Sequence, residues 1–127
     1  MDILLDTHVA LWFFEDDKRL SKSAAEVIYN LENMIYVSIV SPWELGIKLS
    51  IGKLKFDGGI DSFMDTIYKN EFALLGIDSK HIKAVTKLPF IHRDPFDRML
   101  IAQAMVEEMV ILTADENIQN YDIKTIW

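Results

Sequence analysis

Short apolar runs and amphipathic segments alternate along the whole chain. Five runs rich in β-branched, aliphatic and aromatic residues predict strands at residues 3–6, 35–40, 72–75, 110–113 and 123–126. Seven intervening segments predict helices at residues 9–14, 23–32, 41–51, 61–70, 79–86, 94–108 and 115–120. Strands that alternate with helices are typical of a parallel sheet with helices on both faces. The pattern therefore predicts an α/β fold in three layers, α/β/α, with a mainly parallel central sheet and a single domain over residues 1–127.

Capping signals stand at the start of three of the predicted helices. S-A-A-E from Ser23 is a capping-box pattern. In S-P-W-E, Ser41 would be the N-cap, the proline would take the first helical position and Glu44 the third. D-P-F-D from Asp94 repeats this layout at the start of the longest helix. Each pattern predicts the first turn of a helix and places an acid in it.

The composition limits the cellular setting. The absence of cysteine excludes disulfides and thiolate metal sites and fits a reducing cytoplasm. The first residues show no basic and apolar leader pattern, and no stretch approaches the roughly 20 apolar residues that span a bilayer. We therefore expect a cytoplasmic protein without a membrane partner. The chain has 127 residues, of which 50% are hydrophobic, and this suffices for one core.

The formal net charge of −7 restricts how the chain could bind nucleic acid. Because phosphate neutralisation needs Lys and Arg, an acidic chain is a poor general binder of RNA or DNA. A nucleic-acid substrate would need a metal ion or a basic rim to reverse the local field. The same acidity suits a basic protein partner, so both interpretations stay open.

Four acids stand at the start of predicted helices, in or near strand-to-helix junctions. They are Asp6, Glu44, Asp97 and Asp115. In open parallel α/β sheets, ligands bind at the carboxyl ends of the strands, near the point where strand order reverses. Three of the acids follow predicted strands and must lie at that edge, whereas the place of Asp97 there is inferred.

Each acid alone has a structural explanation, since carboxylates cap helices and complement the helix dipole. Together the four predict a metal site, because like charges gathered at one edge repel unless protons or a cation neutralise them. Oxygen ligands without His or Cys select Mg²⁺ or Mn²⁺, and such a site suits phosphodiester hydrolysis. We expect Asp94, directly before a proline, to cap its helix, and Asp97, one turn in, to face the metal.

Four stretches of the chain carry a resemblance to a known family. They are L-L-D-T-H-V-A-L-W, S-P-W-E-L-G-I-K-L-S-I-G-K-L, H-R-D-P-F-D-R-M-L-I-A-Q-A and I-L-T-A-D, followed by the ending Y-D-I-K-T-I-W. In this order they resemble the PIN-domain ribonucleases, and more closely the VapC toxins of toxin–antitoxin pairs. The resemblance implies a PIN-like fold and assigns the family's acids to Asp6, Glu44, Asp97 and Asp115. The fourth position varies within the family, and Glu116 competes for it.

The resemblance also implies an activity and partners. Mg²⁺ or Mn²⁺ would bind mainly through Asp6, Asp97 and Asp115, and Glu44 would bind the metal or orient the water that attacks an RNA phosphodiester. Family members cut RNA, often tRNA or ribosomal RNA, and so stop translation. They are neutralised by a cognate antitoxin and are commonly homodimers, so we expect RNA, an antitoxin and a second copy of the chain as partners.

Three further residues are candidate substrate contacts. The resemblance places Thr7 after the first acid, where it would hydrogen-bond the metal's waters. Lys48 lies four residues after Glu44 and would form either an i,i+4 ion pair or a phosphate contact. Arg98 would pair with a carboxylate or contact substrate. The histidines show no metal-ligand spacing, and His92 is expected only to help set the turn before the longest helix.

Other functions fit the sequence less well. A catalytically silent PIN-like module, whose acidic edge binds a basic protein, would not need all four acids. A haloacid-dehalogenase-like phosphatase needs a second aspartate two residues after Asp6, where His8 stands. A receiver domain needs a lysine after a late strand, and a flap-type nuclease usually carries more acids and DNA-gripping helices. The silent module therefore stays as the alternative to a metal-dependent endoribonuclease toxin.

Overall fold

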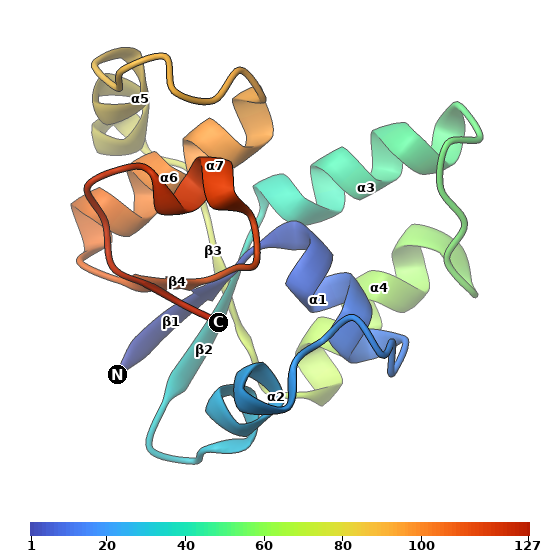
Figure 1. The fold of residues 1–127 in the computed structure, drawn as a ribbon. Helices are drawn as coiled ribbons and strands as arrows, with labels where there is room; N and C mark the ends of the chain where they lie inside the picture. The colour runs from blue at the N-terminus through green and yellow to red at the C-terminus, as the bar shows by residue number, and fades with distance from the viewer.

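A five-stranded parallel sheet forms the centre of the computed structural model, which describes residues 1–127. The strands are β1 (Asp2–Leu5), β2 (Met34–Ser38), β3 (Ala73–Leu75), β4 (Val110–Leu112) and β5 (Thr125–Ile126). They lie in the order β3-β2-β1-β4-β5, and every neighbouring pair is parallel (Figure 1). All five strands that the sequence predicts are present, and the predicted α/β class is confirmed.

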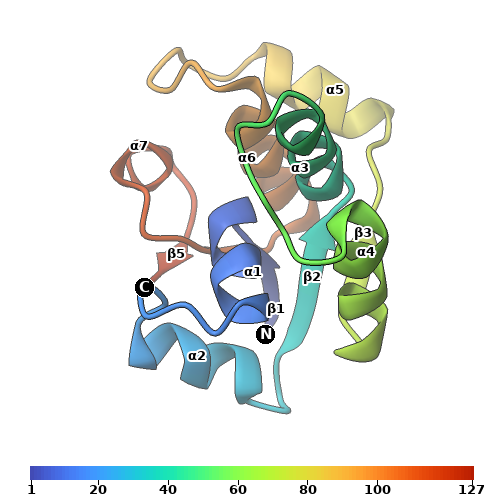
Figure 2. The same ribbon diagram turned by 90° about the vertical axis from the view of Figure 1, so that its right-hand side faces the viewer.

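Helices cover both faces of this sheet (Figures 1 and 2). They are α1 (Thr7–Phe14), α2 (Lys22–Tyr29), α3 (Val40–Ser50), α4 (Gly59–Lys69), α5 (Ser79–Thr86), α6 (Pro95–Glu107) and α7 (Glu116–Gln119). Buried side chains of α1, α2 and α4 form a core on one face, and those of α6 and α7 form a core on the other, with α5 packed against α6. The three-layer prediction is therefore confirmed. No helix has both the length and the apolar character of a membrane-spanning segment.

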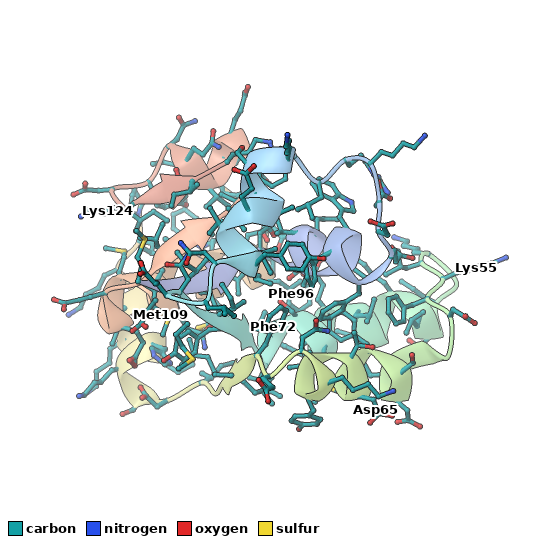
Figure 3. The ribbon with its side chains drawn as sticks, turned by 90° about the horizontal axis from the view of Figure 1, so that it is seen from below. Lys55, Asp65, Phe72, Phe96, Met109 and Lys124 are labelled. Carbon is teal, nitrogen blue, oxygen red and sulfur yellow. The ribbon has the colours of Figure 1, made fainter.

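The alternation of side chains along β1 explains why two cores form. Ile3 and Leu5 point into the core beneath α1 and α2, whereas Leu4 points into the core beneath α6. Successive side chains of a strand face opposite sides of the sheet, so a strand covered on both faces is apolar throughout. Phe72, just before β3, packs against the first core, while Lys55 and Lys124 project outward from the periphery (Figure 3).

The strand order creates a switch point between β1 and β4. The chain passes from β1 to β2 and β3 on one side, and then returns to the other side of β1 to form β4 and β5. The loops after β1 and β4 thus leave neighbouring strands in different directions, which opens a crevice at the carboxyl edge of the sheet. The backbone N–H of Asp6 donates to the Leu112 carbonyl at 3.1 Å and fixes these two loops together.

The N-cap of helix α2 lies two residues before the one that the sequence predicts. The N-cap is Ser21, whose Oγ accepts from the Ala24 N–H at 3.0 Å, and not Ser23. The helix ends at Tyr29 instead of residue 32.

The start of α3 also corrects the prediction that Ser41 is an N-cap. The helix begins at Val40, and the Oγ of Ser38 accepts the Val40 N–H at 3.1 Å. Ser41 lies inside the first turn and its hydroxyl hydrogen-bonds Thr7 Oγ1 at 2.7 Å. The proline that follows is tolerated because the first four N–H groups of a helix have no partner within it. Glu44 therefore lies deeper in the helix than a capping-box acid.

Candidate metal centre

The four predicted acids come from four different elements and meet at the switch-point crevice. Asp6 joins β1 to α1, and Asp115 joins β4 to α7. Glu44 lies in α3, and Asp97 lies in the first turn of α6. The starts of these helices gather at the same edge of the sheet (Figures 1 and 2). Electrostatic coupling links Asp97 to Asp6 and Glu44, and Asp6 to Asp115.

Asp6 is buried, and only one of its two carboxylate oxygens has a hydrogen-bond partner. Its Oδ2 accepts a hydrogen bond from Thr113 Oγ1 at 2.7 Å, while its Oδ1 is buried without any partner. The Thr113 hydroxyl also accepts the Asp115 N–H at 3.0 Å, so one side chain positions both loops. Burial raises the pKa of Asp6, and the hydrogen bond from Thr113 opposes that rise.

Asp97 forms a hydrogen bond with a histidine side chain. Its Oδ2 lies 2.7 Å from His92 Nε2, which also lies 3.8 Å from Asp115 Oδ2. Because His92 Nδ1 accepts the Arg93 N–H at 3.1 Å, Nε2 carries the ring proton and donates a hydrogen bond to Asp97 Oδ2. Burial and the neighbouring charge of Asp6 raise the pKa of Asp97 to about 7. At neutral pH this carboxyl is therefore poised between its two protonation states.

Glu44 is buried beside a lysine. Its Oε2 accepts from Lys48 Nζ at 2.6 Å, which confirms the predicted i,i+4 ion pair. Its Oε1 is buried without a partner, as Asp6 Oδ1 is. The Lys48 side chain keeps 36% of its surface exposed, so the predicted phosphate contact stays a prediction.

The donor set fits a divalent cation. Two buried carboxylate oxygens without partners carry a desolvation cost that a bound cation would remove. One ligand atom from each of His92, Asp97 and Asp115 lies within 4.8 Å of the others. The free ligand atoms are carboxylate oxygens, as Mg²⁺ and Mn²⁺ prefer, while both ring nitrogens of His92 are occupied by hydrogen bonds.

Asp94 has the structural role that the sequence predicts. It is the N-cap of α6, and its Oδ1 accepts the N–H groups of Phe96 at 2.8 Å and Asp97 at 3.0 Å. Asp115 caps α7 in the same manner, by accepting the Asn117 N–H at 2.8 Å, but its Oδ2 also approaches His92. The structural and the metal-site interpretations of Asp115 are therefore compatible. Glu116 is exposed in the first turn of α7.

Arg98 does not take the role that the sequence predicts. Its guanidinium is buried and donates to the carbonyl oxygens of Pro89, His92, Val85 and Leu88 and to the Tyr121 hydroxyl. No carboxylate lies within ion-pairing distance of it. The planar fork of an arginine can join several acceptors at once, so Arg98 fixes the loop before α6 instead of contacting substrate.

Thr7 is held by the protein. Its buried hydroxyl bonds to Ser41, which joins the first turns of α1 and α3 next to the acids. This contact positions the elements that carry Asp6 and Glu44. A hydrogen bond from Thr7 to a metal-bound water stays a prediction.

Sequence reasoning missed two members of the site, His92 and Thr113. His92 stands five residues before Asp97, and Thr113 two residues before Asp115, within stretches already singled out by their acids. Neither residue type at that spacing signals a contact, since both partnerships cross between elements. The sequence predicts only that His92 helps to set the turn before α6, whereas its side chain also contacts two acids.

A second group of acids and a histidine is explained by helix capping. His81 Nδ1 accepts the Asp78 N–H at 3.0 Å, and Asp78 Oδ1 accepts the His81 N–H at 3.3 Å, in a capping box at the start of α5. His81 Nε2 lies 3.2 Å from Glu107 Oε1. Both ring nitrogens are occupied, so this group has no free nitrogen for a metal.

Comparison with known proteins identifies the family of the chain and solved structures of similar fold. The PIN domain family model matches residues 3–124. A VapBC2 structure from Rickettsia felis, bound to a promoter DNA fragment, matches with a TM-score of 0.74 at 16% identity, over 99% of this chain and 98% of that one. VapBC-1 from nontypeable Haemophilus influenzae gives a TM-score of 0.70 at 16% identity, over 99% and 97%. DNA-bound VapBC from Salmonella typhimurium gives 0.66 at 13% identity, over 99% and 97%.

At these low sequence identities, the similarity to the solved structures concerns the fold alone. No curated protein gives a significant match by sequence. The family match is independent of them and spans nearly the whole sequence, from the first strand to the residue before the last strand, β5. The chain therefore belongs to the PIN-domain family.

Proposed function

We propose that this protein is a metal-dependent endoribonuclease toxin of the VapC type, which hydrolyses RNA phosphodiester bonds with Mg²⁺ or Mn²⁺. The observation that carries the proposal is the acid cluster at the switch point. Two of its buried oxygens have no partner, and the pKa of Asp97 is raised to about 7. Carboxylates with perturbed pKa values in a crevice are typical of functional sites.

The side chains of the cluster suit separate roles. Asp6, Asp97 and Asp115 would hold the cation, and His92 would orient the Asp97 carboxylate through its 2.7 Å hydrogen bond. When bound, the cation would supply positive charge that offsets the carboxylates and stabilises charge developing on the phosphodiester. Glu44 Oε1 is free to accept a proton from an attacking water, while Lys48 holds the other oxygen of that carboxylate in place.

The partners follow from the same proposal. The three solved structures above pair a VapC-type protein with a VapB protein, and two of them are bound to DNA. We infer that a cognate antitoxin covers the acidic crevice of this chain in the cytoplasm.

A second copy of the chain is the other partner. Apolar surface for a homodimer is supplied by exposed Trp43, Ile47 and Ile51 along α3 and Ile82 on α5. Light scattering of the purified chain checks this, and a monomeric mass would contradict the dimer.

Cleavage of total RNA by the purified protein tests the activity. Reactions would contain Mg²⁺, Mn²⁺ or EDTA, with Asp97→Asn and Asp94→Asn variants in parallel. Asp97→Asn should reduce cleavage by about 100-fold or more, because even residues that only orient a metal ligand contribute 10–100-fold. Asp94→Asn is the matched control, since asparagine caps a helix as well as aspartate does.

Discrete fragments that need metal, persist in Asp94→Asn and disappear in Asp97→Asn would support the proposal. Cleavage that survives EDTA, or that survives equally in both variants, would contradict it. If the wild-type protein neither cleaves RNA nor binds Mn²⁺ in calorimetry, the silent interaction module becomes the better explanation of the acidic edge.

A further inference from the structure

A second hollow opens directly beside the candidate metal centre. It has a volume of about 350 Å³ and lies between α1 and the loop after β4. Asp6 and Asp115 line one side, and His8, Trp12 and Arg19 line the other. A space of this size falls within the range of small-molecule pockets. The hollow therefore shares two residues with the acid cluster and adds a wall of different chemistry.

Aromatic rings form that wall. His8 and Trp12 lie one turn apart on α1, and their ring centroids are 6.1 Å apart with an interplanar angle of 42°. Trp127 packs against Trp12 in an edge-to-face contact, with the ring centroids 5.9 Å apart. His8 is exposed and Trp12 is half-buried, so both rings reach the hollow with their positions fixed by the helix.

Arg19 adds a positive charge to the same wall. Its Cζ lies 5.2 Å from the centroid of the Trp12 ring, and 68% of its side-chain surface is exposed. Asp17 holds the guanidinium through Nε at 3.1 Å and Nη2 at 2.8 Å, which leaves Nη1 free to donate to a ligand. A planar cation fixed against an indole is a surface on which nucleobases stack.

We propose that this hollow binds one nucleobase of the RNA, adjacent to the phosphodiester that the acid cluster would cleave. The inference rests on the proposed nuclease function and adds where the substrate is gripped. His8 and Trp12 stack with the base, and Arg19 contacts the base or its phosphate. Single-stranded RNA is recognised in this way, by stacking of splayed bases on aromatic rings and guanidinium planes.

The charges favour a nucleotide over a basic peptide. A lysine or arginine of a protein partner would be attracted by Asp6 and Asp115 but would meet the guanidinium of Arg19 at the other wall. A nucleotide suits this wall, because Arg19 attracts its phosphate and the aromatic rings can stack on either π-face of its base. In a chain of net charge −7, Arg19 has Asp17 as its ion-pair partner and offers the phosphate one free donor, and a cation held by the acids would supply the reversal of field that RNA binding requires.

The three tryptophans make a direct test possible in the intact protein. In ¹⁵N-labelled protein, Trp12, Trp43 and Trp127 each give one indole N–H signal, assigned by single Trp→Phe variants. The four nucleoside monophosphates would be added in turn, with ribose 5-phosphate as the probe that lacks a base. These compounds contain no phosphodiester, so the test does not depend on cleavage.

We expect nucleotides to shift the Trp12 signal, and that of Trp127 packed against it, more than ribose 5-phosphate does. Trp43 is the internal control, because it lies on α3 and lines a separate hollow with Phe96. A Trp12 signal that no nucleotide moves, or that ribose 5-phosphate moves equally, overturns the proposal. So does a tetra-arginine peptide that shifts Trp12 when nucleotides do not, since the hollow would then belong to a basic partner.

Cleavage kinetics provide the second arm. Trp12→Ala should raise KM for RNA by about 10- to 100-fold, which corresponds to the loss of one stacked base, with little change in kcat. Trp12→Phe should stay near wild type because it keeps a ring, and Tyr68→Ala, at an exposed aromatic residue of α4, is the matched control. An unchanged KM in Trp12→Ala contradicts the base site. If the wild type cleaves no RNA, the nuclease proposal fails separately, and the indole signals still decide the base site.

Discussion

Thr113 joins two of the candidate acids through one hydroxyl group. It donates to Asp6 Oδ2 at 2.7 Å and accepts the Asp115 N–H at 3.0 Å. The threonine is fully buried, so water does not replace it. Its position at the switch point lets a single side chain set both the charge state of Asp6 and the direction in which the chain turns into α7.

The first prediction concerns this hydroxyl. Thr113→Val keeps the shape of the side chain but removes both hydrogen bonds, so the pKa of Asp6 should rise further and Mn²⁺ should bind about 10- to 100-fold more weakly. Isothermal titration calorimetry with Mn²⁺ measures this. Thr113→Ser is the matched control because it keeps the hydroxyl. Equal affinities in the valine and serine variants would show that Thr113 is only a packing residue.

At the scale of elements, the loop between α5 and α6 depends on Arg98. This loop carries His92 and Asp94 to the site, and it has no helix or strand of its own. Arg98 and Tyr121 bind its carbonyl oxygens, including Pro89 O at 2.9 Å and 2.7 Å, respectively. The ring of Phe90 stacks on the guanidinium with its centroid 4.3 Å from Cζ.

The second prediction follows from these contacts. Arg98→Ala should lower the free energy of unfolding by about 3 kcal/mol or more, because hydrogen bonds to charged groups contribute about 1.5–3 kcal/mol each and several acceptors would lose theirs. Arg98→Lys should recover only a small part, since an ammonium cannot join acceptors in one plane. Urea unfolding followed by circular dichroism provides the values. Arg93→Ala, at an exposed neighbour, should change little.

The elements were predictable because apolar runs and capping residues are local signals. Every predicted strand and helix is present, and the differences lie at the ends of the elements. Ser21 and Ser23 are both good N-caps, and only packing of the helix against the core decides between them. At α3, the hydroxyl of Ser38 receives the first N–H, and no pattern around Ser41 reveals this.

The candidate site was predictable in part, for a related reason. Asp6, Glu44 and Asp115 follow strands of one parallel sheet, so topology alone brings their starting points to one edge. The contacts of His92 and Thr113 depend on how a loop folds back over that edge, which is tertiary information. The role expected of Arg98 was wrong because an exposed substrate contact and a buried loop clamp look alike in sequence.

At the scale of the whole molecule, the acid cluster makes stability depend on pH and on metal. The pKa of Asp97 is raised from 3.8 to about 7, and that of Asp6 is raised in the same direction, chiefly by burial. Between these values the folded protein holds protons that the unfolded chain has released. Stability of the metal-free protein is therefore greatest below about pH 4 as far as Asp97 is concerned, and it is lost as pH rises through about 7.

The third prediction is that, in EDTA, the free energy of unfolding falls by about 2–3 kcal/mol between pH 5 and pH 7.5 on account of Asp97. Asp97→Asn, which cannot ionise, should flatten this dependence and be more stable than wild type at pH 7.5. Asp65→Asn, on the outer side of α4 (Figure 3), should keep the wild-type slope. Urea unfolding at each pH gives the comparison.

Metal should reverse the same dependence, because a cation replaces the protons that the cluster otherwise holds. Mn²⁺ should raise the stability of the wild type more at pH 7.5 than at pH 5, where it competes with bound protons, and should do little for Asp97→Asn. A wild-type slope that matches Asp97→Asn in EDTA would show that burial does not hold Asp97 protonated. Equal stabilisation by Mn²⁺ at both pH values would show that the ion binds somewhere other than this cluster.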